Sequence, residues 1–120
     1  MGCTPKLLFG PGLITATGGT YQNLFTSNST AIFYIVKHIH VANNDASNIH
    51  TFYLCLTTVS GTDNTGWLFG LPVVASSTYD WYSPGLVIPQ QVSSTIYYLN
   101  AAADVTNKLI ITVEGEGGPV

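Results

Sequence analysis

The chain has 120 residues, of which 46% are hydrophobic and only 8% are charged, and its formal net charge is −3. A chain of this length is expected to form one domain with a modest core. Its three basic residues, all lysine, argue against nucleic-acid binding, because phosphate neutralisation needs many cationic groups. No apolar run approaches the ~20 residues that cross a membrane, so no membrane partner is predicted.

Residues 1–12 are predicted to form an extended N-terminal arm. Proline and glycine recur here too densely for a helix, around an apolar patch of Leu7, Leu8 and Phe9. Such an arm needs a surface to lie on, either its own sheet or a neighbouring subunit. The patch is therefore a candidate anchor to a partner.

The segment from Ala31 to Thr58 predicts a β-hairpin of two long strands. Residues that are β-branched or aromatic fill both arms, and small polar residues gather between them. Side chains alternate along a strand, so one face of each arm should point into a shared core. These core residues are Phe33, Ile35, Ile39 and Val41 on the first arm and Phe52, Leu54 and Leu56 on the second. The other face then carries His38, His40, Thr51, Tyr53 and Cys55.

Short strands separated by turn residues fill the remainder of the chain. They are expected at Leu13–Thr17, Thr20–Thr26, Trp67–Gly70, 73–75, Tyr79–Tyr82, Leu86–Ile88, Ser94–Asn100 and Lys108–Glu114. About eight to ten strands, spaced by about 8 to 12 residues, are typical of an antiparallel β-sandwich, jelly-roll-like in arrangement. The all-β domain is predicted to span 13–115, followed by a flexible tail over 116–120.

Two histidines on one strand face raise the question of a metal site. His38 and His40 are two residues apart, so their rings should lie about 7 Å apart on one face. By the same alternation, His50 lies on the opposite face, and neither arm carries an aspartate or glutamate. Solvated or interface histidines are therefore favoured, and no metal or other cofactor is predicted.

Catalytic motifs are also lacking in the sequence. There is no Gly-x-Ser-x-Gly motif, and the six acidic residues lie mostly in turns or near the tail. The loop from Thr62 to Gly66 has oxygen ligands suited to calcium but lacks the further acidic positions of a calcium loop. An ordinary turn is favoured there, and the protein is not expected to be an enzyme.

Tryptophan and tyrosine residues leave two interpretations open. Trp67, Tyr79, Trp81, Tyr82, Tyr97 and Tyr98 could form a flat platform on which sugars stack. Alternatively, Trp67, Trp81 and Tyr97 fill the core, while Tyr79, Tyr82 and Tyr98 lie at a subunit interface, where tyrosine is enriched. The second interpretation is favoured.

The order of several motifs resembles that of a known class of proteins. Val36–Asn43, a polar turn and Thr51–Leu56 together resemble the "IhvaN … vtLwl" hairpin of small structural proteins of tailed bacteriophages. Further matches follow in order at 79–81, 84–89, 95–98 and 111–115, so the resemblance spans roughly Leu13 to Gly115. A departure occurs at Pro89–Val92, where related proteins often have a glycine turn.

The resemblance implies a β-sandwich virion protein. Within this class, we expect a capsid decoration (cement) or minor capsid protein that is made in the host cytoplasm, trimerises and binds the major capsid protein on the virion surface. The alternative is a carbohydrate- or receptor-binding module of a tail or fibre that recognises a host-surface glycan through exposed Trp and Tyr. The candidate contact residues are Leu7, Leu8, Phe9, His38, His40, Tyr53, Tyr79, Trp81 and Tyr82.

Overall fold

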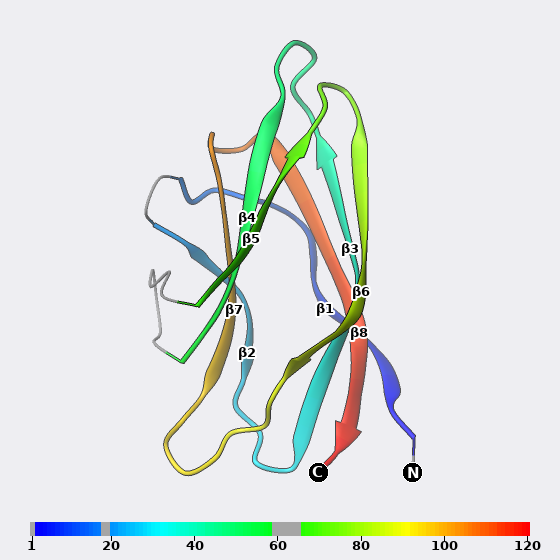
Figure 1. The fold of residues 1–120 in the computed structure, drawn as a ribbon, viewed down its shortest axis with the longest axis vertical. Helices are drawn as coiled ribbons and strands as arrows, with labels where there is room; N and C mark the ends of the chain where they lie inside the picture. The colour runs from blue at the N-terminus through cyan, green and yellow to red at the C-terminus, as the bar shows by residue number, and fades with distance from the viewer. Residues whose placement is uncertain (1, 18–19, 59–65) are drawn as a thin grey trace.

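The computed structural model describes residues 2–17, 20–58 and 66–120, apart from the side chain of Trp67, and forms two packed antiparallel sheets (Figure 1). Its strands are β1 (Thr4–Leu13), β2 (Gln22–Ser27), β3 (Ile32–Asn43), β4 (His50–Thr57), β5 (Trp67–Val73), β6 (Thr78–Ile88), β7 (Tyr97–Ala103) and β8 (Leu109–Pro119). The predicted all-β sandwich is confirmed. Within the described ranges, no helix has the length and apolarity that a membrane crossing requires. The predicted turn at 62–65 lies outside the described residues.

Strand pairing is nested in the manner of a jelly roll. One sheet has the order β1-β8-β3-β6 and the other β2-β7-β4-β5. The first strand thus pairs with the eighth, the second with the seventh, the third with the sixth and the fourth with the fifth. Among the pairs that the structure describes, only β4 with β5 joins consecutive strands. This nesting brings side chains from distant parts of the sequence onto the same sheet face.

The predicted hairpin between Ala31 and Thr58 is wrong. Its two arms are β3 and β4, which are both long strands but belong to different sheets. The polar segment between them is long enough to cross the ~10 Å gap between sheets. Asn43 stabilises this crossing, because its side-chain amide donates hydrogen bonds to the carbonyls of Asn48 and Val73, both at 2.9 Å.

The two arms nevertheless share one core, as predicted. Ile39 and Val41 of β3 are buried across the sandwich from Phe52 and Leu54 of β4. The prediction for Ile35 and Phe33 was wrong, because the β3 register shifts between Val36 and His38 and reverses the alternation. Val36 is therefore the buried residue N-terminal to the shift, while Ile35 and Phe33 are partly exposed.

The strand β6, which pairs with β3 across this register shift, is one continuous strand where the sequence predicts two. Ser83, Pro84 and Gly85 were expected to end one strand and start another, but β6 continues through them. Tyr82 pairs with His38 and Leu86 with Val36, so the extra β6 residues are accommodated at the irregularity. On the other side of β3, a Cβ atom at Gly115 would clash with the Ile35 carbonyl oxygen, so this close approach requires glycine.

Both chain ends are part of the sandwich and lie at the same end of the molecule (Figure 1). The expected arm over 1–12 is mostly β1, an edge strand paired with β8 from Thr4 to Leu13. The expected tail over 116–120 continues β8 as far as Pro119, which pairs with Ile32. Each segment thus lies on its own sheet, because the two ends supply backbone partners to one another.

Candidate functional site

Four polar side chains meet on the outer face of the β1-β8-β3-β6 sheet. His38 and His40 project from β3, between Asp80 of β6 and Glu114 of β8. Strand register explains the meeting, because His40 pairs with Asp80 and His38 pairs with Glu114. We call these four residues the histidine–carboxylate cluster.

A single carboxylate oxygen joins the two imidazole rings. The Nε2 atom of His38 and the Nδ1 atom of His40 each lie 2.7 Å from Asp80 Oδ1. On its other side, His38 Nδ1 lies 3.2 Å from Glu114 Oε1. The ring of Tyr82 stacks on that of His38, with centroids 4.6 Å apart and an interplanar angle of 11°. His38 is therefore held by contacts at both ring nitrogens and on one ring face.

The cluster alters the ionisation of its members. Partial burial of His38 lowers its pKa, but hydrogen bonds to Asp80 and Glu114 outweigh that effect, so the net pKa is raised above its ordinary value. Hydrogen bonds from His40, and then from His38, hold the pKa of Asp80 below its ordinary value. The side chains of His40 and Asp80 are each 39% exposed, which leaves the cluster open to solvent and ions.

Sequence reasoning missed the two carboxylates of this cluster. Asp80 and Glu114 are 42 and 76 residues from His38 in sequence and lie on strands other than the one that carries the histidines. The sequence at 79–82 predicts a strand, on which Asp80 and Trp81 point to opposite faces. Only the pairing of β3 with both β6 and β8 places those faces together.

The third histidine lies on the other sheet, not on the opposite face of the predicted hairpin, which the structure does not form. His50 begins β4 in the other sheet, where its Nε2 atom lies 2.7 Å from Asp45 and its Nδ1 atom 3.1 Å from Asp104. The hydrogen bond to Asp45 is the main reason that the pKa of His50 is raised, despite burial. The backbone N–H of Ser47, followed by His50, holds the pKa of Asp45 well below its ordinary value.

Exposed apolar side chains lie on the two outer strands of this sheet, β1 and β6, on either side of the histidine–carboxylate cluster. Leu7 and Leu13 of β1 are 56% and 43% exposed, and Tyr82 and Val87 of β6 are 72% and 45% exposed. Leu7 pairs with Glu114, which places it beside the cluster. We call Leu7, Leu13, Tyr82 and Val87 the apolar rim.

The predicted Leu7–Phe9 anchor is only partly available for contact. Leu8 is buried at 7% exposure, and Phe9 packs against the same core. Strand alternation in β1 leaves Leu7 facing outward. The candidate contact therefore reduces to Leu7, while its two neighbours stabilise the fold.

The predicted aromatic residues are dispersed rather than gathered. Trp81 points inward and contacts Phe69, with ring centroids 4.7 Å apart, whereas Tyr82 points outward.

Tyr53 packs against Tyr21 and Cys55 in a small cluster on the other sheet, so the predicted common face of Tyr53, Cys55, His38 and His40 is wrong. Tyr79 is 37% exposed opposite Val41. Tyr97 packs against the core, as one interpretation predicted.

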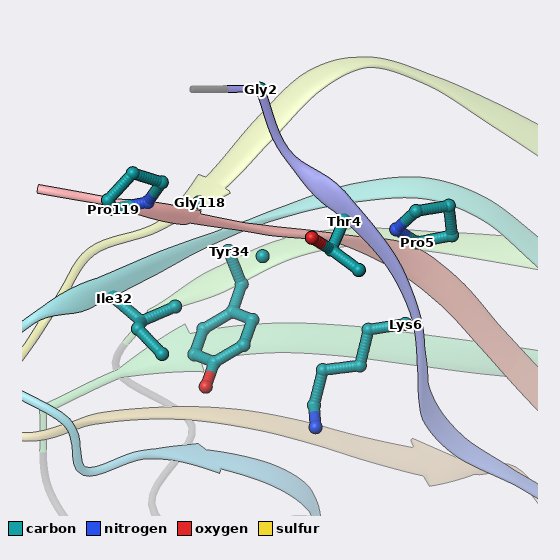
Figure 2. A pocket seen from close by; sticks show the side chains of 9 residues that line it. Gly2, Thr4, Pro5, Lys6, Ile32, Tyr34, Gly118 and Pro119 are labelled. Atoms are coloured by element: carbon teal, nitrogen blue, oxygen red, sulfur yellow. The ribbon is translucent and has the colours of Figure 1, made fainter.

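A separate pocket of about 470 Å³ opens at the end of the sandwich where the chain termini lie. Figure 2 shows the side chains of Ile32, Tyr34 and Lys6 pointing to the same side of the sheet. The ammonium of Lys6 lies 6.0 Å from the centre of the Tyr34 ring. Backbone atoms and apolar side chains make up much of this pocket, so it offers few groups for chemistry.

Comparison with known proteins gives no further assignment: no protein-family model matches the chain, and no curated protein sequence matches it.

Proposed function

We propose that the protein is a structural component of a tailed-phage virion, a capsid decoration protein that acts by surface contact without catalysis. Its proposed partner is the major capsid protein, its proposed oligomer is a trimer, and its proposed location is the capsid surface. Two features support the proposal: the motif order that resembles small phage structural proteins, and the jelly-roll topology, which viral capsid domains often adopt.

The observation that carries the proposal is the apolar rim on one outer sheet face. Leucine, valine and tyrosine side chains exposed together on a β-face are typical of a protein–protein contact. The same face also carries Asp80, Glu114 and the Lys37–Glu116 ion pair, but the chain as a whole is only 8% charged, far below the roughly 25% of an average soluble domain. Binding through this face would join neighbouring capsid subunits, so each copy would add association free energy to the assembled shell.

Point variants of the rim test this proposal better than removal of the N-terminal segment. Truncation would delete β1 and with it Leu8, so loss of binding would follow from unfolding. Leu7→Glu and Val87→Glu instead place charge on the exposed face without altering the core. Val74→Glu is the matched control, because Val74 is 59% exposed but lies in the turn after β5.

The measurement is co-sedimentation of the purified chain with phage heads that lack it. We expect saturable binding by the wild-type protein and the Val74→Glu control, with at least tenfold weaker binding by each rim variant. Equal binding by all four proteins would remove the rim from the proposal.

Copy number and glycan binding distinguish the decoration role from the alternatives. Quantitative mass spectrometry of purified virions should find on the order of hundreds of copies per particle. A few copies per particle together with a reproducible hit on a glycan array would instead support the tail or fibre module. Complete absence from virions would contradict both roles. The dispersed aromatic residues favour the decoration role.

A further inference from the structure

We propose that the histidine–carboxylate cluster binds one divalent transition-metal ion of the zinc class. The ligands would be His38 Nε2, His40 Nδ1 and the Asp80 carboxylate, with Glu114 positioning His38. This site is independent of the proposed virion role and would stand if that role failed.

The three ligand atoms already converge on one point. All lie within 4.8 Å of one another, and both imidazole nitrogens contact the same oxygen of Asp80. Tetrahedral zinc with bonds of about 2.0 to 2.2 Å separates its ligand atoms by about 3.3 Å. The present 2.7 Å contacts would lengthen by about half an ångström, and the two ring nitrogens, at most 4.8 Å apart, would approach each other by up to about 1.5 Å. All three side chains are partly exposed, so they have room for that adjustment.

Metal binding would replace the protons that now hold the cluster together. In the metal-free protein, each ring nitrogen that faces Asp80 needs a hydrogen to donate to Oδ1. A bound ion would take the lone pairs of these nitrogens, with the His38 Nε2 proton released to solvent and the His40 hydrogen carried on its Nε2 atom instead. The site charge supports this exchange, because two neutral histidines with Asp80 and Glu114 carry two negative charges, which a divalent ion balances.

Glu114 completes the site as a positioning residue. It lies 3.2 Å from His38 Nδ1, on the side of the ring opposite Asp80. Donation of the Nδ1 hydrogen to Glu114 leaves the Nε2 lone pair directed at the ion, which is the carboxylate–histidine–metal arrangement common in metalloproteins. Stacking of Tyr82 on His38 further fixes the plane of the ring.

Ligand chemistry indicates which ions fit. Two imidazoles with one carboxylate suit zinc, nickel or copper, whereas calcium and magnesium prefer sites built from oxygen alone. Three protein ligands leave a fourth position open toward solvent, where a water molecule would bind. Zinc is therefore the probe for the test.

Isothermal titration of zinc chloride into the full chain is the primary test. We expect one ion per chain, at least tenfold weaker binding by His40→Ala and Asp80→Asn, and about 10- to 100-fold weaker binding by Glu114→Gln. Glu116→Gln is the matched control, because Glu116 lies on the same strand and face but pairs with Lys37 instead. Its zinc affinity should equal that of the wild-type protein.

Two further measurements separate a built site from loose surface binding. Nitrogen NMR of the imidazoles should show zinc-dependent shifts at His38 Nε2 and His40 Nδ1, with His50 unaffected. Circular dichroism checks that each variant is folded, and the near-isosteric Asp80→Asn change keeps the test valid if an alanine variant unfolds. Zinc affinity that is unchanged in Asp80→Asn and His40→Ala, or shifts absent from these two nitrogens, would overturn the proposal.

Discussion

At the scale of single residues, the contact between His50 and Asp45 has an effect on stability that can be measured through its dependence on pH. His50 is buried at the start of β4, where Asp45 and Asp104 face its two ring nitrogens. Asp45 also accepts hydrogen bonds from the backbone N–H groups of Ser47 and Asn48. The contact therefore closes the loop by which the chain crosses from β3 to β4.

The pKa shifts of this pair predict a pH window of stabilisation. The lowered pKa of Asp45 contributes stability above its ordinary value of 3.8, which is lost as the pH falls. The raised pKa of His50 contributes stability below its ordinary value of 6.5, which is lost as the pH rises through the folded-state value. The pair should thus stabilise the fold most between pH 3.8 and pH 6.5.

Thermal melting of wild type and His50→Gln from about pH 3 to about pH 9 checks this window. Glutamine can still donate a hydrogen bond but cannot become charged. The difference in melting temperature should be largest between pH 3.8 and 6.5 and should shrink on both sides. A difference that stays constant with pH would show that His50 acts by packing alone. The histidine–carboxylate cluster is present in both proteins, so its own pH dependence drops out of the difference in melting temperature.

At the scale of elements, β1 shows why a segment with dense proline and glycine is difficult to assign from sequence. Its residues do not favour a helix, and that inference was right. Whether an extended segment joins a sheet depends on whether another strand offers it free backbone groups. Here β8 does so over the length of β1. Leu8 then enters the core, and Leu7 remains outside.

This arrangement predicts opposite responses to alanine at neighbouring positions. Leu8→Ala removes a side chain that is only 7% exposed and should lower the free energy of unfolding by about 2 to 4 kcal/mol. Leu7→Ala should change it by less than about 0.5 kcal/mol, because Leu7 is 56% exposed. Denaturation in urea measures both values. Equal and small effects would mean that residues 4–13 do not pair with the sheet in solution.

The failed hairpin prediction has a physical reason at the same scale. Strand character and a polar connection were both correct for β3 and β4, but neither property fixes which strands share hydrogen bonds. Two amphipathic strands can bury the same apolar faces as neighbours in one sheet or as opposing strands in two sheets. The burial of Ile39 and Phe52 is compatible with either arrangement, and the other strands decide between them.

At the scale of the whole molecule, nested pairing predicts slow folding. The outermost pair joins β1 to β8, so its formation must close nearly the entire chain into a loop. All-β proteins dominated by such distant pairings fold over milliseconds to seconds. Stopped-flow refolding followed by tryptophan fluorescence should therefore give a main phase slower than about 1 ms. A main phase in the microsecond range would show that local contacts dominate the rate-limiting step.

The sequence by itself determined the all-β fold class and the strand character of most of the chain. These properties follow from residue composition and from the alternation of side chains along a strand, which are local. It also determined the low charge of the chain as a whole.

Only the tertiary structure decided the strand partners, and with them the candidate site. The register shift at Val36 reversed the faces of the residues before it, and pairing with β6 and β8 brought Asp80 and Glu114 to the histidines. Such contacts depend on backbone hydrogen bonds between distant segments, which carry no sequence signature of their own. For that reason, the sequence predicted two isolated histidines where the structure places a four-residue cluster.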